Sequence, residues 1–229
     1  MEKISVIIPT VQKNIKVLNK LLNLLARDSA VGEIVLINNA IMQFVPMKQT
    51  KNKLKILNQQ ENLYVNQSWN LGIEKISNNK FLIINDDILC CEKFVSKILR
   101  TGILDKPETG LIGLDNRYIK HYEVNTKNID VPDSCKEGDI SFTQMLNHFY
   151  TGDWGSCFWG KKENYYIIPD GIKIIYGDNY LLYKNLQNGK KNYSISGLKC
   201  NHIHSLSSSS NEFGDVVCED INNYKQFFD

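Results

Sequence analysis

Two adjacent aspartates at the end of a buried segment are the residues of this sequence best suited to chemistry. The run Phe81–Ile84 is wholly apolar, which predicts a strand covered on both faces, and Asn85, Asp86 and Asp87 follow it directly. In an open α/β sheet, ligands bind beyond the carboxyl ends of the strands. Neighbouring carboxylates there can hold a hard divalent cation, which in turn binds a diphosphate. A solvated turn that ends the strand explains the same three residues equally well.

His202 is a further candidate metal ligand, although a lone histidine is more often a structural residue. Imidazole together with carboxylate suits Mn²⁺ better than Ca²⁺, and Mg²⁺ is also compatible. A competing zinc site would take its ligands from the cysteines and histidines near the C-terminus, namely Cys200, His202, His204 and Cys218. Their spacing follows no common zinc pattern. His121 and His148 belong to no motif and are interpreted as surface or structural residues.

The first hundred residues alternate strand-like and helix-like segments. Strands are predicted where short, β-branched apolar runs occur, at Ile4–Pro9, Glu33–Ile37, Leu54–Leu57 and Phe81–Ile84. Over Asn14–Ala26 and Asn66–Ile76, apolar residues recur at three- and four-residue spacing, the pattern of amphipathic helices. Strands and helices that alternate in this way indicate βαβ units and a mainly parallel sheet.

The second half of the chain is less regular. Prolines, glycines and charges over residues 105–140 predict loops and short strands. Further elements are predicted beyond them: a helix over Asn179–Asn188, a strand over Tyr193–His204, a loop at Ser207–Ser210 and a closing helix over Asp220–Phe228. No repeat or linker divides the chain, so we expect a single domain over residues 1–229.

Composition and charge exclude several classes of protein. The 229 residues carry a formal net charge of +2, and the lysines form only short, scattered clusters. Both observations argue against a protein that coats nucleic acid. Apolar runs are far shorter than the ~20 residues of a membrane-spanning helix, and no signal peptide is recognisable. Six cysteines without a secretory signal are expected to be reduced thiols. We therefore expect a cytoplasmic protein, with no sequence signature of an oligomer.

The order and spacing of several motifs resemble the family 2 glycosyltransferases. The nucleotide-sugar-binding half of that family is matched by ISVIIPT (4–10), EIVLINNA (33–40), NLYVNQSWNLGI (62–73) and FLIINDDI (81–88). GSCFWGKK (155–162) resembles the segment on the acceptor side, and IPDGIKIIYGDNYLLYK (168–184) resembles the stretch that holds the family's acidic pair. The resemblance covers about residues 4–205. It is greatest to the compact glycosyltransferases encoded by large algal viruses, which would place the protein in the host cytoplasm.

This resemblance implies the GT-A fold, an α/β domain with a Rossmann-like, mostly parallel central sheet flanked by helices. Residues of about 1–100 would bind the nucleotide sugar, and residues of about 101–229 would bind the acceptor.

Carried over position by position, the resemblance implies a donor site at the ends of the first strands. The matching residues are Pro9, Thr10, Val11, Asn39, Asn62, Asn66, Asn70, Asn85 and Asp86. Val11 replaces a common tyrosine, so the nucleotide pocket loses a stacking ring. Asn39 replaces the usual aspartate, and because an amide donates as well as accepts hydrogen bonds, the identity of the base stays open. Asp86 would bind the ribose.

The family's Glu-Asp pair appears here as Asp178-Asn179, so Asp178 would inherit the role of the base that removes the acceptor proton in an inverting transfer. An N-cap for the following helix is an equally good interpretation of Asp178. In that case Asp153 supplies the base, or the enzyme retains configuration. Asp153, Trp154 and Gly155 would lie on the acceptor side, although ordinary core packing explains Trp154 equally well.

These expectations combine into a metal-dependent glycosyltransferase. Asp87 and His202 would hold Mn²⁺ or Mg²⁺, and a hexose would move from a donor of the GDP-mannose or UDP-glucose type to a hydroxyl of a glycan or glycoprotein. The departures at Asn39 and Asn179 leave a weak or inactive nucleotide-sugar-binding module as the alternative. A nucleotidyltransferase is disfavoured, because no Gly-rich phosphate loop occurs near the N-terminus.

Overall fold

The computed structural model describes residues 2–147, 152–203 and 213–228. His148, His204 and the predicted loop at Ser207–Ser210 lie outside the described residues. The α-helices are α1 (Ile15–Arg27), α2 (Tyr64–Lys75), α3 (Phe94–Arg100), α4 (Gly177–Gln187) and α5 (Gly214–Asn223). The strands are β1 (Ile4–Thr10), β2 (Val31–Asn38), β3 (Leu54–Asn58), β4 (Lys80–Ile84), β5 (Ile88–Cys90), β6 (Thr109–Leu114), β7 (Ile119–Tyr122), β8 (Ser141–Met145), β9 (Cys157–Lys161), β10 (Lys191–Ser196) and β11 (Cys200–Ile203).

The strands and helices predicted in the first hundred residues are confirmed as β1 to β4, α1 and α2. Every residue of β1 is buried, as its β-branched, apolar sequence predicts. In α1, the leucines at three- and four-residue spacing face the core, and the side chain of Asn14 caps the helix by accepting the N–H of Val17. None of the helices that the structure describes is long and apolar enough to cross a membrane.

One sheet of eight strands runs through both halves of the chain, in the order β3-β2-β1-β4-β9-β6-β10-β8. Neighbours from β3 to β4 are parallel, as are β6 and β10, whereas β9 and β8 run antiparallel to their neighbours. β2 and β3 lie on one side of β1, whereas β4, the next strand along the chain, lies on the other side. The point at which the strand order reverses, where such sheets bind ligands, therefore lies between β1 and β4.

A second, smaller sheet has the strand order β5-β11-β7. It shows that the prediction of one continuous strand over Tyr193–His204 is wrong, because β10 ends at Ser196 in the large sheet and β11 begins at Cys200 in the small one. Between them Gly197 has φ of 84°, and a Cβ there would lie 2.0 Å from the carbonyl oxygen of Asp139. The chain thus turns sharply at a position that only glycine can occupy.

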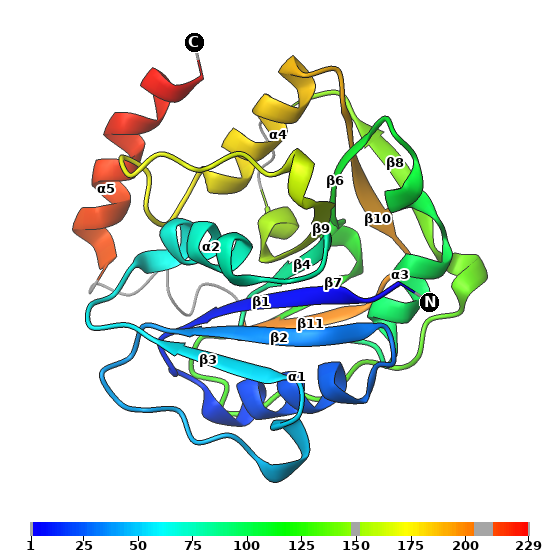
Figure 1. The fold of residues 1–229 in the computed structure, drawn as a ribbon, viewed down its shortest axis with the longest axis vertical. Helices are drawn as coiled ribbons and strands as arrows, with labels where there is room; N and C mark the ends of the chain where they lie inside the picture. Colours follow the sequence, from blue (N-terminus) through cyan, green and yellow to red (C-terminus); the bar gives the residue numbers. More distant parts are fainter. Residues whose placement is uncertain (1, 148–151, 204–212, 229) are drawn as a thin grey trace.

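Helices cover both faces of the large sheet (Figure 1). Ile4, Val6 and Ile8 of β1 belong to the core that includes α1, α3 and the small sheet. Ile7 points to the opposite face and belongs to the core that includes α2 and α4. This alternation follows from the two-residue period of a strand.

The loops and short strands predicted over residues 105–140 include β6 and β7. β6 lies in this range, and all of its residues are buried within the large sheet. Its glycines suggested loops, yet they mark close packing: a Cβ on Gly113 would lie 2.2 Å from the ring of Trp154. The closing helix also begins earlier than predicted, with α5 over Gly214–Asn223 followed by a 3₁₀ turn over Tyr224–Phe227.

Candidate functional site

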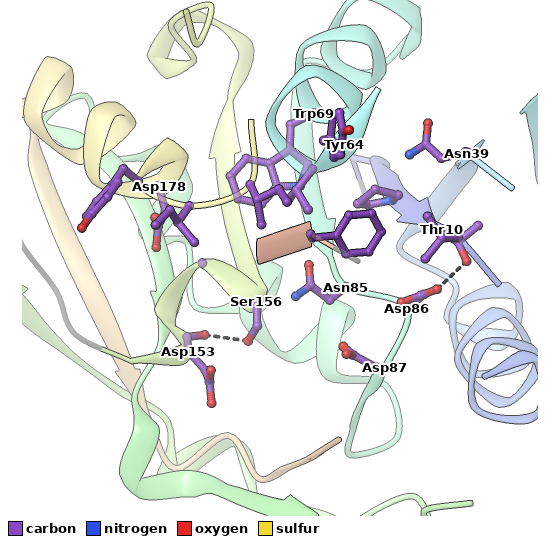
Figure 2. A pocket seen from close by; sticks show the side chains of 18 of the residues that line it. Thr10, Asn39, Tyr64, Trp69, Asn85, Asp86, Asp87, Asp153, Ser156 and Asp178 are labelled. Carbon is purple, nitrogen blue, oxygen red and sulfur yellow. Dashed lines mark hydrogen bonds between the residues drawn. The ribbon is translucent and has the colours of Figure 1, made fainter. Parts of the chain in front are cut away.

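A cavity of about 420 Å³ opens at the carboxyl ends of β1, β2 and β4. Thr10 ends β1, Asn39 follows β2, and Asn85 begins the turn after β4. The opposite wall is formed by the segment that enters α4, including Tyr176 and Asp178. Figure 2 shows Asp178 and Asp86 on opposite sides of this cavity. The cavity thus lies where the reversed strand order predicts a ligand site.

Most residues that the sequence predicts for the site line this cavity. They are Pro9, Thr10, Val11, Asn39, Asn62, Asn85, Asp86, Asp87, Asp153, Gly155, Asp178 and His202. The cavity is also lined by residues that the sequence analysis missed, notably Tyr64, Trp69, Ile174, Ile175, Tyr176 and Phe213. All but Phe213 lie within segments that the sequence analysis matched to the family, but the resemblance assigned these side chains no role.

Asp86 is tied to the end of β1. The hydroxyl of Thr10 donates to its Oδ2, and the backbone N–H of Gln12 donates to the Thr10 hydroxyl oxygen over 2.9 Å. Burial and the neighbouring Asp87 raise the pKa of Asp86 to about 7. A bound cation would favour the ionised form of both carboxylates, which otherwise repel each other.

Backbone strain gathers around the cavity. The backbone of Gln12, Tyr64 and Tyr176 has φ of 59°, 59° and 64°. Residues other than glycine rarely adopt this left-handed region. Tyr64 and Tyr176 line the cavity, and Gln12 follows its residue Val11. Such conformations persist only where surrounding contacts impose them, and they concentrate at functional sites.

His202 is held between two carboxylates. Its Nε2 lies 3.2 Å from Oδ1 of Asp87, and its Nδ1 lies 3.4 Å from Oδ2 of Asp153. Burial lowers the pKa of His202, but the two carboxylates outweigh burial and raise it to about 10. The imidazole is therefore protonated at neutral pH unless a cation takes the place of the proton on one ring nitrogen.

The small sheet brings these groups together. Asp87 immediately precedes β5, His202 lies in β11, and His121 of β7 is the register partner of His202. His121 Nδ1 lies 3.3 Å from Oδ2 of Asp153. The interpretation of His121 as a residue without a role at the site is therefore incomplete. No local pattern could reveal it, because the pairing of β7 with β11 is long-range.

The residues present fit a divalent ion. The 3.2 Å between a carboxylate oxygen of Asp87 and a ring nitrogen of His202 lets both atoms face one ion, and this mixed donor set suits Mn²⁺ or Mg²⁺. Among the described residues, the zinc hypothesis finds no support from Cys200, which is buried beside Cys90 with 2.8 Å between the sulfur atoms, or from Cys218, which is exposed.

Asp178 lies in the first turn of α4, and the N-cap residue of that helix is Tyr176. The interpretation of Asp178 as the N-cap is therefore wrong, although its carboxylate does accept the N–H of Asn179 over 3.0 Å. Burial raises the pKa of Asp178 to about 6. A carboxylate of this kind can accept a proton near neutral pH. Gly155 makes room for it, since a Cβ there would lie 2.5 Å from Asp178 Oδ2.

The segment that leads to Asp178 is clamped from two sides. From α2, the side-chain amide of Asn66 donates to the carbonyls of Ile172 and Ile175. From α5, the carboxylate of Asp220 accepts the N–H groups of residues 173, 174 and 175 over 2.7, 2.7 and 2.9 Å. Asn66 is fully buried and does not line the cavity. The resemblance implied that Asn66 is a donor-site residue, whereas the structure places it behind the opposite wall, which its amide holds in place.

Two further predicted residues lie behind the cavity wall. Asn70 donates to the carbonyl of Ile168 and accepts from the hydroxyl of Tyr165, so it supports the segment before α4. Trp154 is fully buried and stacks on Phe158 with 5.5 Å between ring centroids. The prediction that Trp154 forms an acceptor wall is corrected: the indole packs in the core.

Asn39 uses its amide within the protein. It donates to the hydroxyl oxygen of Ser68 over 2.9 Å, and its carbonyl oxygen accepts the N–H of Leu63 over 3.3 Å. Both contacts hold the start of α2 against the end of β2. The amide is thereby oriented at the cavity edge.

Comparison with solved structures identifies the fold. The chain aligns over 100% of its length with 50% of GalNAc-T7, solved with UDP, GalNAc and Mn²⁺, at a TM-score of 0.66 and 16% identity. It aligns over 99% of its length with 63% of the mannosyltransferase PcManGT from Pyrobaculum calidifontis, solved with GDP-Man and Mn²⁺, at a TM-score of 0.61 and 11% identity. For S. aureus TarS 1-349, 98% of the chain covers 72% of that protein, at a TM-score of 0.57 and 18% identity.

The chain thus spans half the length of GalNAc-T7 and under two thirds of the mannosyltransferase. Its sequence matches no protein-family model and no curated protein. The mostly parallel sheet with helices on both faces, shared with these structures, is the GT-A fold.

Proposed function

We propose that the protein is a metal-dependent glycosyltransferase that moves a hexose from a nucleoside-diphosphate sugar to a hydroxyl group of a glycan or glycoprotein. The observation that carries the proposal is the placement of carboxylates on opposite sides of one cavity. Asp86 and Asp87 lie at its strand-end edge, and Asp178 lies on the opposite wall (Figure 2). Similar folds solved with UDP or GDP-Man, in two cases together with Mn²⁺, support a nucleotide-sugar donor.

Asp87 and His202 would hold Mn²⁺ or Mg²⁺, and the ion would act as a Lewis acid that stabilises the negative charge of the departing diphosphate. Asp86 would bind the ribose, and Asn39, Asn62 and the β1 end would hold the nucleoside. This leaves the sugar between the strand-end edge and Asp178.

Asp178 would act as the base. As the acceptor oxygen forms its bond to the sugar and the sugar–phosphate bond breaks, the proton of the acceptor hydroxyl passes to Asp178. This step inverts the anomeric centre. The anomer of the product, determined by proton NMR, tests it, because a product with retained configuration contradicts a base at Asp178.

The donor is proposed to be of the GDP-mannose or UDP-glucose type. Thermal unfolding against a panel of sugar nucleotides, with and without Mn²⁺, identifies it, because a ligand that binds only the folded state raises the melting temperature. A metal-dependent rise with one donor, followed by transfer or hydrolysis of that donor, supports the proposal. The absence of any rise with every donor and ion contradicts it.

A nucleotide-sugar-binding module without transferase activity is the second candidate. It is favoured by Asn179, which stands where the resemblance places the second acid of the catalytic pair. Tight, metal-dependent donor binding without transfer or hydrolysis would support this module over the enzyme. For either function we expect the cytoplasm as the compartment, and the host cytoplasm if the protein is viral.

A further inference from the structure

His202 has a carboxylate at each of its two ring nitrogens. Asp87 Oδ1 faces Nε2 at 3.2 Å and Asp153 Oδ2 faces Nδ1 at 3.4 Å. The side chains of His202, Asp87 and Asp153 are 4%, 8% and 14% exposed, so all three are largely withdrawn from water. A histidine that ligates an ion through one nitrogen carries its proton on the other. The two carboxylates therefore have different roles once an ion is bound.

We propose that Asp153 is a positioning residue for the metal site: it holds the Nδ1–H of His202, so that the Nε2 lone pair faces the ion held by Asp87. The inference rests on the proposed function, whose metal site it deepens. Histidine ligands almost always donate their second N–H to a carboxylate or carbonyl, which sets the tautomer and ring orientation and increases the basicity of the ligating nitrogen. This gives Asp153 a role other than that of an acceptor-side base.

Asp153 is held in place by its own turn. Its N–H donates to Asn116 Oδ1 over 2.8 Å, and its carbonyl accepts from the hydroxyl of Ser156 over 2.6 Å (Figure 2). The preceding Gly152 has φ of 149°, and a Cβ there would lie 1.9 Å from Asn116 Nδ2. These contacts restrain the backbone of Asp153 and thereby the position of its carboxylate. A group that supports a metal ligand requires such a fixed position.

His121 contacts Asp153 from the outer side. Its Nδ1 lies 3.3 Å from the same Oδ2 that faces His202, and its side chain is 41% exposed. His121 does not line the cavity. It therefore supports Asp153 weakly, as expected for a partly exposed pair.

The same side chains could form an ion site of a different kind. Ligand atoms of His121, Asp153 and His202 lie within 4.8 Å of one another, and two histidines with one carboxylate suit several transition metals. In that arrangement Nδ1 of His202 binds the ion and Nε2 donates to Asp87, so the two aspartates exchange roles. Two observations favour our assignment: Asp87 adjoins Asp86 at the cavity edge, and His121 lies outside the cavity in which a diphosphate would meet the ion.

The test is the binding of Mn²⁺ alone to the purified chain, without a sugar nucleotide. The electron paramagnetic resonance signal of free Mn²⁺ measures how much of the ion stays unbound. We expect D87N to abolish measurable binding and D153N to weaken it about ten- to a hundredfold. H121Q should weaken binding less than about fivefold. D170N removes an exposed carboxylate outside the cavity and serves as the matched control, which should bind as the wild type does.

Binding by D153N at wild-type strength overturns the positioning role. Loss of binding in D153N and H121Q, with binding retained in D87N, also overturns it and places the ion at His121, Asp153 and His202. Failure of the wild-type chain to bind Mn²⁺ overturns the metal site of the proposed function as well. The failure of this inference is therefore distinguishable from that of the proposed function.

A measurement on the wild-type chain keeps the inference testable if D153N does not fold. With Zn²⁺ as a diamagnetic ion, nitrogen-15 NMR of the His202 ring should show a metal-bound Nε2 and a protonated Nδ1. The reverse assignment overturns the proposal.

Discussion

The two walls of the cavity are built in different ways. The strand-end edge depends on a contiguous turn, Asn85 to Asp87, that follows β4 directly. The opposite wall depends on contacts between distant parts of the chain: Asn66 reaches Ile172 across 106 residues, and Asp220 reaches Lys173 across 47. The first wall thus follows from where a strand ends, whereas the second forms only after α2, α4 and α5 have packed.

This difference predicts which variants act on chemistry alone and which act through the fold. Apart from those that break the buried Asp87–His202 pair, variants at the strand-end edge should change activity with little change in stability. Variants in the clamp around residues 172–176 should change both.

The largest effect is expected for D178N, because it removes the proposed base and leaves a group of the same shape. The rate constant kcat should fall about 10²- to 10⁴-fold, with donor binding unchanged in a thermal-shift assay. D170N, an exposed aspartate of the preceding turn, is the matched control. Activity of D178N near the wild-type level would refute the role of this residue.

The pH dependence of activity and stability gives a second test of the role of Asp178 as the base. Burial raises the pKa of its carboxyl to about 6, so wild-type activity should decline as the pH falls through about 6 and the base becomes protonated. Because the folded protein binds this proton more tightly than the unfolded chain, Asp178 should also make the fold less stable as the pH rises from about 4 to about 6. Asp86, whose pKa is raised to about 7, contributes trends of the same sign, so the contribution of Asp178 is the difference between the wild type and D178N in initial rates and in urea unfolding.

The next largest effect is expected for D87N, which removes the charge of a proposed metal ligand. Loss of electrostatic stabilisation of the departing diphosphate should lower kcat/KM by about 10²- to 10³-fold, and added Mn²⁺ should restore little of it. In the absence of metal, relief of the repulsion between Asp86 and Asp87 should offset only part of the stability lost with the buried Asp87–His202 pair, so the free energy of unfolding should fall. D133N, an exposed aspartate, is the control, and an active D87N would contradict the metal site.

D220N tests the opposite wall, because Asp220 belongs to the clamp around residues 172–176 and does not line the cavity. An amide accepts fewer hydrogen bonds than a carboxylate, so the three N–H groups of residues 173–175 cannot all be satisfied. Stability should fall by about 1–3 kcal/mol and activity by about 10- to 10²-fold, measured by urea unfolding and initial rates. D215N, on the exposed side of the same helix, should change neither.

The smallest effect is expected for T10V, which removes the hydroxyl that donates to Asp86. Without this donor the pKa of Asp86, already raised to about 7, should rise further, because the hydrogen bond favours the ionised carboxylate. Activity should fall severalfold near neutral pH and approach the wild-type value in more alkaline buffer. T10S keeps the hydroxyl and should behave as wild type; a pH-independent loss in T10V would argue against this explanation.

The sequence predicts the strand-end wall well, because its features are local. β-branched runs predict β1, β2 and β4, and the residues after each of them line the cavity. The sequence also places Asp178 near the start of a helix, although the N-cap is Tyr176. Local patterns suffice where a residue's position follows from the end of its own strand or helix.

The remaining features depend on pairings between distant segments. The break between β10 and β11 places His202 in a separate sheet, beside His121. No local sequence pattern around either histidine predicts that contact. Gly113 and Trp154 suggested a loop and a pocket wall, yet they pack on each other in the core. Asp220 had no recognisable partner in the sequence, because its carboxylate accepts hydrogen bonds from backbone N–H groups, which every residue except proline carries.

The small sheet also determines when the proposed ion site can first form during synthesis of the chain. Asp87 and His202 are separated by 115 residues, and the strand that carries His202 is the last of that sheet to leave the ribosome. Domains begin to fold from the N-terminal side as they are made, so the large sheet can start to form before its ion site exists. An ion held by Asp87 and His202 would stabilise only chains that extend through β11, and nascent or truncated chains that end before β11 would gain nothing from it.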